Sequence, residues 1–160
     1  MKERIIMDYD KIMQDLSNLE KDMEKISTLF LGAISYLEKE LARKINKEGA
    51  VKVFDIANVK RERIGNTPST CEDKYQIGFN VSLTLNDETF KYVDDSMHLM
   101  WTSKRECARE NVELMYGETD RFYLTTGNQS GLDNLHNKIM MFIEKKIKTK
   151  GNEFALKNND

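Results

Sequence analysis

Five arginines are the residues of this sequence best suited to hold a ligand. Arg105 and Arg109 are four positions apart and would lie on one face of a helix. Arg61 and Arg63 would share one face of a strand, and Arg121 would begin a later strand. Guanidinium groups bind phosphate and carboxylate in a bidentate geometry, so convergence of the five would create an anion or nucleotide pocket. The many neighbouring glutamates favour the alternative, in which each arginine pairs locally.

A glycine-rich segment at 127–131 offers a second place for an anion. It lies between a predicted strand and the start of a predicted helix, where free backbone N–H groups favour phosphate or carboxylate. The segment lacks the lysine of a phosphate-binding Walker-A loop, so a plain strand-to-helix turn is the simpler interpretation. We add Gly127, Asn128 and Ser130 to the five arginines as the candidate ligand site.

The sequence predicts no catalytic residues, metal site or cofactor. Asp94 and Asp95 are adjacent, so on a strand they would point to opposite faces and could not share a proton or a metal. No nucleophile elbow, Walker-A loop or dinucleotide fingerprint is present. The remaining candidate metal ligands stand alone in the sequence, without the spacing of a zinc site. They are His98, His136, Cys71 and Cys107.

One long helix is predicted over residues 1–48. Residues 4–47 contain no proline, apolar residues recur in alternating steps of four and three, and Gly49 ends the pattern. A helix of about 43 residues would be roughly 65 Å long, whereas a compact domain of this size has a radius of gyration of roughly 15 Å. We therefore expect residues 26–45 to be buried and residues 5–23 to project towards another copy. The expected oligomer interface comprises Ile5, Tyr9, Ile12, Leu16, Leu19, Met23, Ile26 and Phe30.

Acidic residues beside the apolar stripe argue against a simple two-stranded coil. In a parallel pair, Asp15 would face Glu20 of the other copy, with no lysine to compensate. Leu29 and Leu31 also make the stripe wide. A wide stripe is typical of a helix packed on a sheet or in a bundle of more than two helices.

The rest of the chain predicts an α+β domain. Residues 75–86 alternate strictly between apolar and polar side chains, which indicates a half-buried strand. Ser103 and Glu106 form a capping box, which predicts a helix from there to about Tyr116. Other strands are expected at 51–59, 89–93, 97–102 and 121–125, a last helix from about 130 to 150, and a disordered tail over 151–160. The prediction is one domain over 1–150 with the order α-β-β-β-(β)-α-β-α. Its antiparallel sheet of three to five strands is packed against helices from both termini.

Charge and composition narrow the function classes. The net charge is −2, and acidic and basic residues are mixed along most of the chain. The absence of a strongly basic segment argues against nucleic-acid binding. No apolar run reaches the roughly 18 residues that cross a bilayer. The N-terminus does not resemble a signal peptide, and two cysteines cannot form a secreted disulfide framework. We therefore expect a cytoplasmic protein.

Three functions follow from these patterns. The first is a non-catalytic interaction or regulatory protein that acts as a homo-oligomer, such as an inhibitor of a host protein encoded by a phage or mobile element. The second is a protein that binds or sequesters a nucleotide or other small anion with the arginines. The third is an enzyme without a familiar motif. We expect the partner to be another copy of the chain, with another protein or a nucleotide-like anion as alternatives.

Overall fold

The computed structural model describes residues 8–124 and 129–158. In these ranges, helix α1 (Tyr9–Lys44) precedes eight strands, and helix α2 (Gln129–Asn158) follows them. The strands are β1 (Val51–Phe54), β2 (Lys60–Ile64), β3 (Glu72–Gly78), β4 (Asn80–Leu85), β5 (Glu88–Tyr92), β6 (His98–Thr102), β7 (Glu113–Tyr116) and β8 (Asp120–Tyr123). The predicted α+β class, with a long first helix and a helix at the end, is confirmed.

The strands form two antiparallel sheets. One has the order β1-β4-β5 and the other the order β2-β3-β6-β7-β8. Strands β3 and β4 follow each other directly, and only Phe79 separates them. The chain changes partners at this point, because β3 pairs with β2 and β6, whereas β4 pairs with β1 and β5. The predicted strand over 75–86 is therefore one extended segment that joins both sheets.

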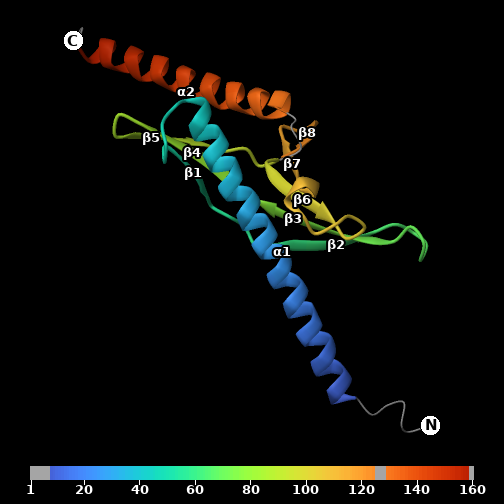
Figure 1. The fold of residues 1–160 in the computed structure, drawn as a ribbon. Coiled ribbons are helices and arrows are strands. Elements are labelled where there is room, and N and C mark those ends of the chain that lie inside the picture. Colours follow the sequence, from blue (N-terminus) through green and yellow to red (C-terminus); the bar gives the residue numbers. More distant parts are fainter. Residues whose placement is uncertain (1–7, 125–128, 159–160) are drawn as a thin grey trace.

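The core lies where the two helices pack on the sheets. Helix α1 crosses the sheets, and helix α2 runs past its C-terminal end (Figure 1). Phe30 and Leu37 of α1 are fully buried, as are Leu99 and Leu114 of the larger sheet. Leu135 of α2 is also fully buried. The apolar faces predicted for the central strand and for both terminal helices meet in this core.

The ends of α1 follow from its sequence. A side-chain oxygen of Asp8 accepts a hydrogen bond from the backbone N–H of Lys11 at 3.2 Å, which caps the first turn. The last turn is followed by Asn46 and Gly49, whose φ angles of 55° and 76° lie in the left-handed region. Gly49 adopts this conformation without a steric cost, so the helix ends close to the predicted position.

Residues 103–116 differ from the sequence prediction. A single 3-10 turn at Arg109–Asn111 and strand β7 replace the expected helix. The hydroxyl of Ser103 accepts the backbone N–H of Asp73 at 2.8 Å instead of capping a helix. Val112, Leu114 and Tyr116 alternate and are buried, so burial against the sheet prevails over the capping signal.

The C-terminal segment also differs. Helix α2 continues through Gly151 to Asn158, so residues 151–158 are helical where a disordered tail was expected. Alanine and long straight side chains follow Gly151, and these favour helix. Neither of the two described helices has an apolar stretch long enough to cross a lipid bilayer.

Candidate functional site

The N-terminal part of α1 extends beyond the sheets (Figure 1). We call residues 9–22 the arm. Half of the large apolar side chains that are exposed in the described part of the chain belong to it. The exposed fractions are 76% for Tyr9, 39% for Ile12, 62% for Met13, 46% for Leu16 and 40% for Leu19. The arm therefore presents an apolar stripe that its own domain leaves uncovered.

The predicted interface is shorter than the sequence indicated. Ile26 and Phe30 are 3% and 0% exposed, so they belong to the core of their own domain and cannot form an oligomer interface. Met23 is half-buried at the point where α1 meets the domain. Ile5 lies outside the described residues. The heptad pattern continues unchanged from arm to core, which is why it could not show where one ends and the other begins.

The arm is acidic around its stripe. Residues 9–22 contain four acidic and two basic residues, a net charge of −2. Asp15 precedes Leu16 and Glu20 follows Leu19, so these acids lie on the two edges of the stripe. Neither side chain forms an ion pair with the described residues. The arm thus combines an apolar surface with uncompensated negative charge.

A basic hollow lies at the opposite end of α1. It has a volume of about 560 Å³ and is formed by the last turns of the helix, the following turn and β1. The basic hollow is defined by its lining residues, Ser35, Glu38, Lys39, Ala42, Arg43, Asn46, Lys47, Glu48, Gly49, Val51 and Lys52. Within the described ranges, Lys39, Lys47 and Lys52 form no ion pair.

The acids of the basic hollow offset only part of this positive charge. Its lining contains two acids, Glu38 and Glu48, against four cations. Glu38 accepts the backbone N–H of Val53 at 2.8 Å, and Arg43 pairs with Glu40, which lies outside the lining. Sequence reasoning did not find this site, because its cations are brought together by the turn after α1. The only signal in the sequence was the abundance of lysine and arginine at the end of the helix.

The five candidate arginines do not share a cleft. Arg61 of β2 lies opposite Tyr75, which lies opposite Trp101, so these side chains share the face that α1 covers. Glu113 of β7 lies opposite Tyr123 of β8, and Arg121 is two positions from Tyr123 in the same strand. The side chains of Glu113, Tyr123 and Arg121 therefore share the other face of the sheet. A single pocket cannot include arginines from both faces.

Arg61 and Arg63 lie beside Asp73 on the covered face. Their Nε atoms are 4.0 Å and 3.8 Å from Oδ1 of Asp73. Asp73 and Tyr75 line a cavity of about 240 Å³ together with Asp22 of α1. Burial raises the pKa of the Tyr75 hydroxyl, and the charge of Arg61 opposes this effect. The two arginines are thus engaged with an acid of their own sheet.

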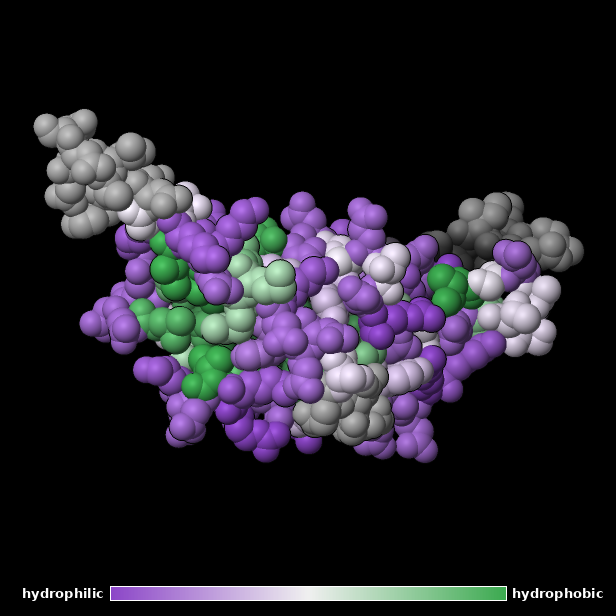
Figure 2. Space-filling view, turned by 90° about the horizontal axis from the view of Figure 1, so that it is seen from above, coloured by the Kyte–Doolittle hydropathy of each residue, from purple (hydrophilic) through white to green (hydrophobic). Residues whose placement is uncertain are grey.

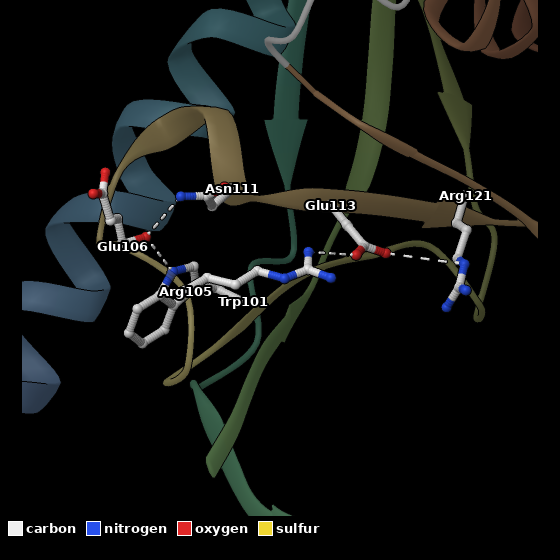
Figure 3. A network of polar contacts seen from close by, with 6 residues as sticks. All are labelled: Trp101, Arg105, Glu106, Asn111, Glu113 and Arg121. Atoms are coloured by element: carbon white, nitrogen blue, oxygen red, sulfur yellow. Dashed lines mark hydrogen bonds and ion pairs between the residues drawn. The ribbon is translucent and has the colours of Figure 1, made fainter. Parts of the chain in front are cut away.

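Arg105 and Arg121 flank Glu113 on the open face (Figure 3). Nη1 of Arg105 is 2.8 Å from Oε1 of Glu113, and Nε of Arg121 is 4.0 Å from Oε2. The Arg105 guanidinium also lies 4.9 Å from the ring centroid of Tyr123. Burial lowers the pKa of Arg105, but the hydrogen bond and charge of Glu113 outweigh it and raise the pKa. A buried carboxylate thus occupies the place that a ligand anion would take.

The other candidate ligand residues are dispersed. Arg109 lies on the 3-10 turn with its guanidinium 5.2 Å from the ring centroid of Tyr36, on α1. Arg105 and Arg109 therefore do not share a helix face. Ser130 is in the first turn of α2, whereas Gly127 and Asn128 lie outside the described residues. No three His, Cys, Asp or Glu side chains of the described chain gather as a metal site requires.

Asp94 has a structural role between two turns. Its Oδ1 accepts the N–H and the hydroxyl of Ser96, at 2.9 and 2.5 Å, and its Oδ2 accepts the N–H of Gly117 at 2.9 Å. Burial alone would raise the pKa of Asp94, but these hydrogen bonds lower it below the ordinary value. The carboxylate therefore stays ionised and joins the β5–β6 and β7–β8 connections.

Comparison with known protein families, curated proteins and solved structures finds no match. Seen from above, hydrophilic side chains cover most of the surface, and hydrophobic ones gather near the two ends, where α2 ends and where α1 begins (Figure 2). Among the described residues, the exposed stripe of the arm and the basic hollow are two features whose apolar area or charge is left uncompensated, and Met141 and Ile147 of α2 are also exposed.

Proposed function

We propose that this chain is a non-catalytic interaction protein that self-associates through the arm. The supporting observation is the exposed stripe of Tyr9, Ile12, Met13, Leu16 and Leu19 on a helix that extends past its own domain. Folding alone does not require these side chains to be apolar, because they contribute nothing to the core. Exposed contiguous apolar surface of this kind marks interaction sites in soluble proteins.

The size of the stripe suits a reversible contact. Full burial of a large apolar side chain contributes roughly 1.5–3 kcal/mol. The five side chains are on average about half exposed, so covering them would contribute roughly 4–8 kcal/mol in total. Association costs an estimated 4–15 kcal/mol in lost freedom of motion. The stripe alone therefore gives weak association, and a stable assembly needs further contacts.

The proposal places the protein in a reducing compartment such as the cytoplasm. Cys71 and Cys107 are both partly exposed free thiols. Such thiols persist in the cytoplasm, where disulfides are kept reduced, and are oxidised more readily outside the cell.

The test is the mass of the protein in solution. Light scattering of the parent protein should give a mass above the 18.7 kDa of one chain. The double variant Ile12→Glu and Leu19→Glu should return to the monomer mass and keep the circular dichroism spectrum of a folded protein, because both side chains are outside the core.

Leu31 provides a matched control. It is 56% exposed on the same helix but lies outside the arm, so Leu31→Glu should leave the assembly intact. A parent protein that is monomeric at all concentrations, or an Ile12→Glu and Leu19→Glu variant that assembles like the parent, contradicts the proposal.

A further inference from the structure

We infer that the arm of one copy docks into the basic hollow of the next, so that the copies associate head to tail. This inference rests on the self-association proposed above and specifies its geometry. The arm offers an apolar stripe between acidic edges, with Asp15 on one side and Glu20 on the other. The basic hollow offers four cationic side chains, whose methylene groups provide apolar surface, because Ala42 and Val51 in its lining are themselves buried.

Side-by-side pairing of two arms is opposed by charge. In a parallel pair, Asp15 faces Glu20 of the other arm. In an antiparallel pair, the edge that carries Asp8, Asp15 and Asp22 faces its own copy. Both arrangements bring acids together with no intervening lysine, and like charges at these positions are destabilising. The arm is therefore better matched to a basic surface than to a second arm.

The basic hollow is that surface within this chain. Lys39, Lys47 and Lys52 are not compensated by ion pairs within the described residues. Long lysine and arginine side chains can also cover apolar surface with their methylene groups while their charged ends reach a carboxylate. In the basic hollow, the methylene groups can therefore cover the apolar stripe of an arm, and the charged ends can pair with its acidic edges.

An arm cannot reach the hollow of its own chain. The two features lie at opposite ends of α1, which has 36 residues and a length of roughly 54 Å. Docking must therefore occur between copies, and a pair joined by one such contact still presents one free arm and one free hollow. A contact of this kind produces rings or open chains when it joins successive copies, and a closed pair when two copies exchange their arms reciprocally.

The decisive experiment mixes two variants that each lack one half of the contact. The arm variant carries Ile12→Glu and Leu19→Glu, and the hollow variant carries Lys39→Glu and Lys47→Glu. Each should weaken self-association at least about ten-fold in Kd, so that sedimentation velocity shows monomers. An equimolar mixture should form a 1:1 complex of twice the monomer mass, because one intact arm and one intact hollow remain.

The mixture also shows that both variants are folded, because it requires a functional surface from each. Lys145→Glu with Lys148→Glu, the same charge change on the exposed face of α2, is the matched control and should assemble like the parent. Added salt gives a second readout. It should weaken a contact between opposite charges, whereas it would strengthen a pairing of two acidic arms.

The outcomes separate the two proposals. A monomeric parent protein overturns both the self-association and the head-to-tail contact. A parent that assembles, with a hollow variant that assembles equally well, overturns only the docking into the basic hollow. Two monomeric variants that form no complex when mixed overturn it as well, as does assembly that strengthens with salt.

Discussion

Gly131 shows how one residue can have a different role from the one its sequence context suggests. It lies in a glycine-rich segment that predicted an anion site, yet the structure uses it for close packing. A Cβ atom at this position would be 2.4 Å from Cγ and 2.8 Å from Cβ of Phe122. Phe122 is buried in the larger sheet, so neither atom can move away easily. Glycine is therefore required here by the contact between α2 and β8.

A substitution at this position should reverse the usual effect of alanine in a helix. Gly→Ala within a helix normally stabilises a protein by roughly 0.5–1 kcal/mol. Gly131→Ala should instead lower the free energy of unfolding by about 1–3 kcal/mol, because the added methyl overpacks against Phe122. Urea denaturation measures this change.

Gly32 provides the internal comparison for this effect. It lies within α1, and a Cβ atom added there would meet no other atom within 4 Å, so Gly32→Ala should raise stability. Equal changes in stability for Gly131→Ala and Gly32→Ala would contradict the packing role of Gly131.

The chemistry of single residues was predictable, but their partners were not. The sequence identified Arg105 and Arg121 as anion-binding side chains and favoured local pairing over a shared pocket. It could not show that both lie beside Glu113, because Arg105 is in a turn that was expected to be helical. The separation of Arg61 from Arg121 depends on strand register, which brings Arg61 opposite Tyr75 on the covered face. Register is fixed by long-range pairing, which a single sequence does not reveal.

At the scale of elements, periodicity predicted structure well where one pattern was present. The long apolar repeat gave α1, and the strict alternation at 75–86 gave the central β3–β4 segment. At 103–116 two signals competed, a capping box at Ser103 and an alternation that begins at Val112. Tertiary burial decided between them, and this information is absent from local sequence.

The two halves of α1 should differ in their exchange of amide hydrogens. Residues 26–44 are held by core packing, whereas residues 9–22 are an exposed helical segment of a length that is marginal in isolation. In the monomeric Ile12→Glu and Leu19→Glu variant, residues 9–22 should therefore exchange far faster than residues 30–41. Hydrogen–deuterium exchange with peptide resolution measures both segments in one experiment.

The parent protein serves as the comparison for this exchange experiment. At a concentration where it is assembled, its arm should be protected, because the docked helix cannot fray. Equal protection of residues 9–22 and 30–41 in the monomeric variant would show that the arm is held by its own domain.

At the scale of the whole molecule, the two sheets share one core. The extended segment from β3 through Phe79 to β4 passes through both sheets, and Phe79 itself is buried. The sequence predicted a single sheet of three to five strands, and strand propensity could not show where strands change partners. Phe30 and Leu37 of α1 belong to the same core cluster as the buried residues of both sheets. We therefore expect both sheets to unfold in one cooperative step.

The single tryptophan makes this cooperativity measurable. Trp101 lies in β6 of the five-stranded sheet, and the three-stranded sheet contains no tryptophan. Leu83→Ala in β4 removes a buried side chain from the smaller sheet and should cost about 2–5 kcal/mol. If the molecule is one cooperative unit, urea midpoints followed by Trp101 fluorescence and by circular dichroism should fall together. The monomeric Ile12→Glu and Leu19→Glu background removes any contribution from assembly. A Trp101 midpoint that stays unchanged while the circular dichroism signal shifts would mean that the sheets unfold independently.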